Sequence, residues 1–122
     1  MGSGALIRKF VSSWLSFQRN PAGSQRWLES EWVVDARISW AHEKPHVLWS
    51  AICDLSKKEL SEWDIGMLGS GPLEDLLNEH YTEFSRVVFK EALTNKTLVA
   101  ALSCVCPPDD FQHEFEIACE KL

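Results

Sequence analysis

No run of apolar residues in this 122-residue sequence approaches the ~20 residues that a membrane-spanning helix requires. We therefore expect no segment that crosses a bilayer. No segment of useful length alternates apolar and polar residues with the period of two that β-strands show, which argues against a sheet. The chain also lacks a recognisable catalytic or cofactor-binding motif. The sequence thus predicts no cofactor and favours a protein that is not an enzyme.

Acidic residues are missing from the first 28 positions, and basic residues are scarce after them. Residues 1–28 carry a formal charge of +4, and residues 29–122 carry −10. Nucleic-acid binding depends on a basic surface that displaces counterions from phosphates, so we expect no nucleic-acid partner. An acidic body suits a basic protein partner better.

Cysteine and histidine occur only four times each, and their spacing is poor for a metal. The best cluster combines Cys104, Cys106 and Cys119 with His113, four ligand types that zinc accepts. The single residue between Cys104 and Cys106 is shorter than the usual gap, and two such positions of a helical tract face different directions. We expect no metal, buried free thiols and, because nothing marks the chain as secreted, a reducing cytoplasmic setting without disulfides.

The composition that is present is that of a globular protein. Hydrophobic residues make up 45% of the chain, charged residues make up 25%, and six Trp supply bulky material for a core. A chain of this size has room for one domain, which we place at residues 5–122. Residues 1–4 read as a flexible lead or an expression remnant.

Apolar residues recur at helical spacing along the whole chain, which predicts an all-α fold of about seven helices. The expected boundaries are near 5–19, 25–42, 46–55, 57–68, 72–93, 97–105 and 109–121. From Pro45 onward, short helices alternate with turns and resemble stacked αα-hairpins, as in a short helical-repeat array. A compact irregular bundle is the alternative.

The first predicted helix is amphipathic and has basic flanks. Its apolar residues form one stripe, which consists of Ile7, Phe10, Val11, Trp14 and Phe17. Such a stripe is most often core, and we expect a packed helix. The alternative is a peripheral anchor that lies on an anionic membrane.

Two later helices carry further expectations. In the second helix, Leu28, Trp32, Ala36 and Trp40 lie four residues apart and predict a buried face, which Trp27, Val34 and Ile38 widen. In the fourth helix, Ser56-Lys57-Lys58-Glu59 matches a capping box. This start places Leu60, Trp63 and Met67 on the inner stripe. Asp109 and Asp110 would cap the last helix.

The most informative stretch runs from Gly69 to His80 and reads as the start of a helix. Gly69 and Gly71 supply a permissive backbone for a turn, and Pro72 fits the first helical turn. Glu74 and Asp75 place negative charge where the helix dipole favours it. The inner face is apolar and consists of Leu73, Leu76 and Leu77, followed by His80.

This Gly-x-Gly-Pro-Leu-Glu-Asp-Leu-Leu block resembles the signature of a family of small bacterial proteins classed as a domain of unknown function. The likeness extends from about Trp27 to Val105 and includes the run Phe84-x-x-Val87-Val88-x-x-x-Ala92 and the pair Leu98-x-x-x-Leu102. The resemblance implies a compact helical fold, an uncharacterised role and no established catalytic residues. Family members tend to have Gly soon after the signature helix, where this chain has His80-Tyr81.

The acidic pair Glu74 and Asp75, with Glu79 and His80, could be read as a general acid–base group. Adjacent helical residues point about 100° apart, however, and no nucleophile or oxyanion donor completes a site. We therefore assign no catalytic residue, and we expect His80 to be a core or capping residue.

Three functions remain open. The favoured one is an acidic protein-interaction module, for example an immunity or inhibitor protein that acts against a bacterial toxin. The alternatives are an enzyme with an unrecognised Glu/His site and a peripheral membrane protein. Surface carboxylates on the polar sides of helices are the candidate partner-binding residues: Glu59, Glu62, Glu79, Glu83, Asp109 and Asp110.

Overall fold

The computed structural model describes residues 2–122. The predicted lead at residues 1–4 includes Met1, which lies outside the described residues. Every regular element of the described residues is helical, which confirms the all-α prediction. The α-helices are α1 (Gly2–Arg19), α2 (Gln25–Ser30), α3 (Trp32–Glu43), α4 (Pro45–Ser56), α5 (Glu62–Leu68), α6 (Glu74–Ala92), α7 (Lys96–Leu102) and α8 (Gln112–Glu120). A π-helical turn, η1 (Gly69–Leu73), and a 3-10 turn, η2 (Asp109–Phe111), complete the set.

Residues 2–122 thus hold eight α-helices rather than seven, because the predicted helix 25–42 is interrupted at Glu31. Residues 2–4 belong to α1, so the first helix begins earlier than expected. The predicted helix 57–68 begins later, at Glu62.

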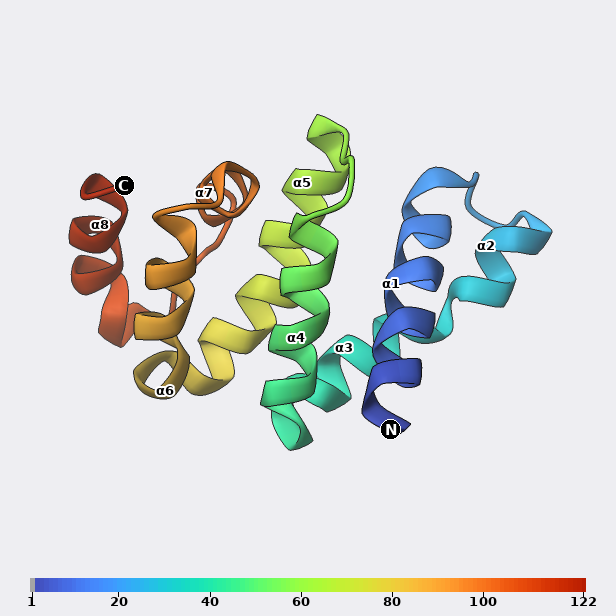
Figure 1. The fold of residues 1–122 in the computed structure, drawn as a ribbon, viewed down its shortest axis with the longest axis horizontal. Helices are drawn as coiled ribbons and strands as arrows, with labels where there is room; N and C mark the ends of the chain where they lie inside the picture. Colours follow the sequence, from blue (N-terminus) through green and yellow to red (C-terminus); the bar gives the residue numbers. More distant parts are fainter. Residues whose placement is uncertain (1) are drawn as a thin grey trace.

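The helices follow one another along the long axis of the molecule, from α1 and α2 at one end to α8 at the other (Figure 1). Between α3 and α4 the chain reverses at Lys44, and Pro45 opens α4 at the position where its missing N–H has no helical partner. Short helices joined by turns make up most of the chain, whereas α5, η1 and α6 follow one another without a break.

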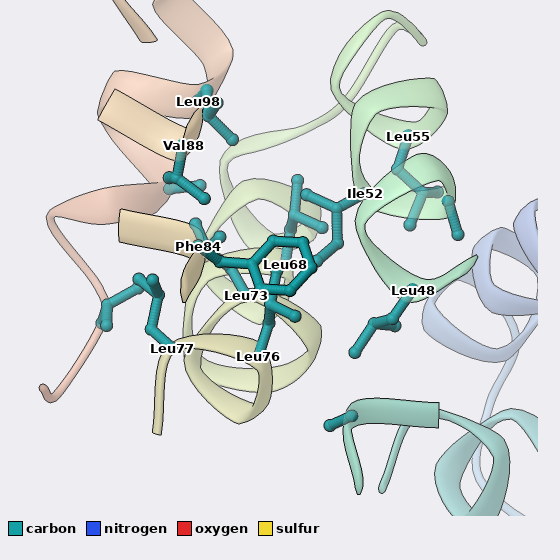
Figure 2. Close-up of a cluster of buried hydrophobic side chains, with 14 of the residues drawn as sticks. Leu48, Ile52, Leu55, Leu68, Leu73, Leu76, Leu77, Phe84, Val88 and Leu98 are labelled. Carbon is teal, nitrogen blue, oxygen red and sulfur yellow. The ribbon is translucent and has the colours of Figure 1, made fainter. Parts of the chain in front are cut away.

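The core lies between α4, the segment that carries the family-like signature (residues 69–77, called the signature segment below) and the second half of α6. Figure 2 shows Leu48 and Ile52 of α4 on one side of the signature leucines, with Phe84 and Val88 on the other. Burial of each such side chain contributes roughly 1.5–3 kcal/mol. The signature segment is therefore the centre of the hydrophobic core.

Helix α1 buries the middle of its apolar stripe. Phe10, Val11 and Trp14 are buried, and the Phe10 ring lies 4.8 Å from the Trp40 ring between centroids. The expected packed first helix is thus observed, and its apolar face is occupied by the protein itself. None of the described helices has both the length and the apolar character that a membrane span needs.

The predicted buried face of the second helix is wrong in part. Leu28 and Ile38 are exposed, whereas Val33, Trp40 and Ala41 are buried. The interruption at Glu31 accounts for Leu28, because α2 and α3 are separate helices and a spacing of four residues does not carry across the break. Within α3 the predicted spacing holds for Trp32, Ala36 and Trp40, which are partly or fully buried.

The expected turn at Gly69–Gly71 is a π-helical turn, and the chain stays helical from α5 through η1 into α6. Pro72 lies inside this turn, and a π-bulge is one of the few devices that accommodate Pro in a helix. The sharp change of direction comes later, at His80, where φ is −138° and ψ is 47°. Because this φ is negative, the bend does not require glycine.

Candidate functional site

The two signature glycines allow close approach of other elements. A Cβ atom on Gly69 would clash with the backbone carbonyl of Ala101 in α7, and one on Gly71 would clash with the guanidinium of Arg37. Both glycines are buried, and Gly69 has an ordinary right-handed helical conformation. Their role is thus the small volume of the residue rather than its backbone freedom.

Glu74 and Asn78 hold the segment that links α7 to α8. The Glu74 carboxylate accepts a hydrogen bond of 2.7 Å from the Cys106 N–H, and the Asn78 amide donates one of 3.1 Å to the Cys106 carbonyl. The backbone N–H and carbonyl of one linker residue, Cys106, are thus both hydrogen-bonded by side chains from one face of α6. Glu74 acts as a structural clamp. The expectation that it lies at a free helix start is wrong, because its own N–H bonds carbonyls of the preceding π-helical turn.

Asp75 lies against Arg37 of α3, with Oδ2 3.5 Å from Nε. This oxygen is buried and has no hydrogen-bond partner among the described residues, so the contact is an ion pair without good hydrogen-bond geometry. Burial raises the pKa of the Asp75 carboxyl, and the nearby Arg37 opposes this rise. The Arg37 side chain thus packs against Gly71 and also pairs with Asp75. The sequence analysis did not select this residue.

His80 caps helix α3. Its Nε2 lies 2.8 Å from the carbonyl oxygen of Ala41, one of the last carbonyls of α3, and donates a hydrogen bond to it. The ring also packs near Phe84, 6.1 Å between centroids. This agrees with the expected core or capping role.

The six candidate partner-binding carboxylates are all exposed, but they lie in two separate places. Glu59 and Glu62 lie at the junction of α4 and α5, on the opposite edge of the molecule from the bend in α6 (Figure 1). Glu79 and Glu83 flank that bend. Asp109 and Asp110 lie in η2, which is close to the same bend. Phe111 of η2 stacks on Tyr81, the residue after the bend, with 4.5 Å between ring centroids.

Asp109 and Asp110 do not cap α8. The N-cap of this helix is Phe111, which makes no side-chain capping hydrogen bond. Glu79 and Glu83 have histidine neighbours, with 3.6 Å from Glu79 to His42 and 3.8 Å from Glu83 to His46. These two carboxylates therefore form intramolecular ion pairs whenever the histidines are protonated.

The junction of α4 and α5 differs from the sequence prediction. The capping box is formed by Ser61 and Asp64, each of which bonds the backbone N–H of the other at 3.1 Å. Ser56, the predicted cap, is buried inside the end of α4, donates to the Cys53 carbonyl and accepts from Asn95. The four residues between these two serines form a linker rather than a helical turn.

This linker forms one wall of a hollow of about 790 Å³, and α1 forms the other. We call it the Trp63 hollow, and its lining residues are Leu15, Gln18, Arg19, Lys58, Glu59, Leu60, Ser61, Trp63 and Asp64. Arg19 closes one side, with Nη2 3.1 Å from Asp64 Oδ2 and 2.8 Å from the Glu59 carbonyl. The charge of Arg19 is thus balanced within the chain.

Trp63 was expected on the inner stripe and is instead 63% exposed at the edge of this hollow. The side of α5 that faces the core carries the buried Asp64 and Leu68, one position on from the predicted stripe of Leu60, Trp63 and Met67. The later start of α5 could have been found in the sequence, because Ser61-Glu62-Trp63-Asp64 also matches a capping box. Trp63 is the residue of the site that sequence reasoning missed.

The cysteines do not assemble into a site. Within residues 2–122, no group of three or more His, Cys, Asp or Glu side chains is placed to hold a metal ion. All four thiols are free. The expectation that they are buried is wrong for Cys104 and Cys106, which are exposed, and Cys53 and Cys119 are only half-buried. Burial raises the pKa of Cys53 to about 11, with a smaller contribution from Glu91, so this thiol stays protonated and unreactive.

Comparison with known proteins places the chain in a family without assigning an activity. No curated protein and no solved structure matches it significantly. One family model, described as a family of unknown function (DUF6869), matches residues 20–114. That range contains α2 to α7 and the signature segment, while α1 lies outside it. Because the match covers most of the sequence, the chain belongs to the DUF6869 family.

Proposed function

We propose that this protein is a non-enzymatic interaction module that binds a basic protein through the Trp63 hollow. The observation that carries the proposal is the exposure of the Trp63 side chain beside a hollow that Glu59 lines, with the exposed Glu62 next to Trp63 in the sequence. A tryptophan left in water costs hydrophobic free energy that a partner recovers by covering it. Tryptophan is also among the residues that dominate binding energy in protein interfaces.

The chemistry around Trp63 suits a partner with exposed lysine or arginine. Glu59 and Glu62 are exposed, and neither forms an ion pair among the described residues. Of the two cations that line the hollow, Arg19 is paired with Asp64, which leaves Lys58 as the cation that a basic partner would meet. Leu15 and Leu60 add apolar surface to the hollow. A basic side chain could pair with the carboxylates while its neighbours cover the indole, an arrangement of apolar centre and polar rim that is common in interfaces.

A narrower form of the proposal is an immunity or inhibitor protein that neutralises a toxin in the bacterial cytoplasm. Such a role requires tight and specific coverage of a partner, with no chemistry of its own. The formal charge of −10 on residues 29–122 supports a basic target.

The test is co-purification with the products of neighbouring genes, followed by association kinetics on the partner found. We expect Trp63→Ala to weaken binding by at least about tenfold, mainly through faster dissociation. Reversal of Glu59 and Glu62 to Lys should slow association, and rising salt should do the same, since exposed charges are screened beyond ~8 Å at physiological ionic strength.

The matched control is reversal of Glu79 and Glu83, two exposed carboxylates near the bend in α6. If this control slows association as much as the Glu59 and Glu62 pair does, the Trp63 hollow is not the binding surface. Unchanged affinity in Trp63→Ala would also reject the proposal. Circular dichroism of each variant checks that the fold is intact.

A further inference from the structure

A second groove, between α6 and α8, is lined almost wholly by apolar atoms. Its volume is about 430 Å³, and its apolar walls come from Phe89 and Leu93 of α6 and from Ile117 and Ala118 of α8. Leu93 is 68% exposed and Ile117 is 39% exposed, although both are large aliphatic residues. Phe89 packs edge-on against Phe115 at 5.7 Å, which makes the floor of the groove a fixed part of the core.

The groove continues past the end of α6. A neighbouring hollow of about 400 Å³ shares Leu93 with it and reaches Val99 of α7. Leu93 therefore stands between two adjoining depressions, at the point where α6 ends and the chain turns into α7. An elongated segment could cover both depressions and bury this residue from both sides.

The rim of this groove is basic, in contrast to the rest of the acidic body. Lys90 and Lys121 line the groove, and Lys96 lines the adjoining hollow. Glu114 is the one acidic residue that lines either of them within the described part of the chain. Residues 29–122 contain only eight basic residues against 18 acidic ones, so three lysines against one glutamate around the groove and the adjoining hollow form a local reversal of charge.

We propose that the groove between α6 and α8 binds an amphipathic helical segment of a partner protein, with apolar side chains on one face and carboxylates beside them. The apolar face would cover Leu93 and Ile117, and the carboxylates would meet Lys90 and Lys121. Such binding of a helix in a groove uses apolar anchors spaced at i, i+3, i+4 and i+7. This surface is distinct from the Trp63 hollow and does not depend on the function proposed for it.

The charge of the rim decides between the possible occupants. A basic segment would place its cations beside Lys90, Lys96 and Lys121, and like charges brought together cost free energy. An acidic segment gains from the same three lysines, because it replaces their mutual repulsion by attraction. The groove and the Trp63 hollow would thus select partners of opposite charge.

The probe is a fluorescent peptide of about 14 residues, with Leu at i, i+3, i+4 and i+7 and Glu at the flanking positions. Its matched control carries Lys in place of every Glu. We expect fluorescence anisotropy to show saturable binding of the Glu peptide and at least about tenfold weaker binding of the Lys peptide. Reversal of Lys90 and Lys121 to Glu should invert this preference.

Leu93→Asp and Ile117→Ser should each weaken the Glu peptide by at least about tenfold. Leu28→Ser in α2 is the matched control, because Leu28 is also an exposed leucine, and it should leave binding unchanged. All three positions are exposed, so the fold should persist, and thermal melts check this. Absence of saturable binding, equal affinity for the two peptides, or an equal loss in Leu28→Ser would overturn the proposal.

A second copy of the chain is the competing occupant. If sedimentation shows a dimer that Leu93→Asp converts to a monomer, the groove is a self-association surface and the peptide proposal is wrong. A monomer across the concentrations used for anisotropy, together with binding of the Glu peptide, supports the proposal.

Discussion

The carboxylate of Glu74 accepts a hydrogen bond of 2.7 Å from the backbone N–H of Cys106, 32 positions away in the sequence. Asn78, one turn further along α6, bonds the carbonyl of the same residue. Two signature-helix side chains thus fix the linker that carries α8 toward the second half of α6. The position of the groove between α6 and α8 depends on this clamp.

Loss of the clamp should loosen the linker while the core remains intact. We expect Glu74→Ala to cost about 0.5–1.5 kcal/mol of unfolding free energy, since a partly exposed hydrogen bond contributes in that range. Amide hydrogen exchange at Cys106 should accelerate, and NMR can measure it at that position. Glu79→Ala, an exposed carboxylate of the same helix, is the control and should change stability by less than about 0.5 kcal/mol. Unchanged exchange at Cys106 in Glu74→Ala would contradict the clamp.

Substitution by alanine should lower the stability of the protein at Gly69 and raise it at Gly66. Gly69→Ala places a methyl group against the Ala101 carbonyl, so α7 must move, and we expect a loss of about 1–3 kcal/mol. Gly66 lies in α5 with open space around its Cα, so Gly66→Ala should stabilise the protein by about 0.5–1 kcal/mol. Urea unfolding measures both values. A neutral Gly69→Ala would mean that α7 does not approach η1 as closely as the structure shows.

The two candidate capping boxes make separable predictions. Ser61→Ala removes the observed cap of α5 and should cost about 0.5–2 kcal/mol. Glu59→Ala removes the acidic member of the box that the sequence predicted, and it should have almost no effect because Glu59 is an exposed linker residue. Thermal melts of the two variants decide the matter. A large effect of Glu59→Ala would restore the predicted helix start.

The separation between fold and binding can be measured with one core and one surface substitution. Leu76 is fully buried in the signature segment, so Leu76→Ala should cost about 2–5 kcal/mol. Trp63→Ala should change stability little, although the residue removed is larger, because most of its surface is already in water. Urea midpoints that fall equally in both variants would show that Trp63 supports the core.

The helical fold and the buried signature leucines could be predicted because apolar periodicity is a local signal. The bend at His80 and its cap on Ala41 could be anticipated only in outline, because the partner carbonyl is 39 positions away. The start of α5 was misplaced because two successive capping motifs compete, at Ser56 and at Ser61, and burial of Ser56 decides between them. Burial is a property of the packed chain and cannot be read from the motif.

The glycines show the same limit in another form. A Gly-Ser-Gly-Pro sequence favours a turn on backbone grounds, and the structure uses it as a π-helical turn pressed against α7 and Arg37. Close approach of distant elements has no local sequence signal. Arg37 is a further instance, since its partners Gly71 and Asp75 follow it by more than thirty positions.

The last prediction concerns Asp75, whose carboxyl has a pKa above its ordinary value of 3.8 because burial disfavours the charged form. The folded protein therefore keeps this proton to a higher pH than the unfolded chain does. As pH rises from 3.8 through the folded-state pKa, the unfolding free energy should fall by the contribution of this residue, and it should then level off. Asp75→Asn cannot titrate, so its stability relative to the natural protein should increase over that pH interval.

Urea unfolding of both proteins at closely spaced pH values measures this difference directly, because the titrations of all other groups cancel. Arg37→Gln provides a second measurement. It removes the cation that opposes the rise in the pKa of Asp75, so the pH range over which stability falls should extend to higher pH. The alternative is that the ion pair with Arg37 dominates. The pKa of Asp75 would then lie below its ordinary value, and the relative stability of Asp75→Asn would decrease as pH rises. The sign of the slope therefore decides whether burial or the ion pair controls this signature residue.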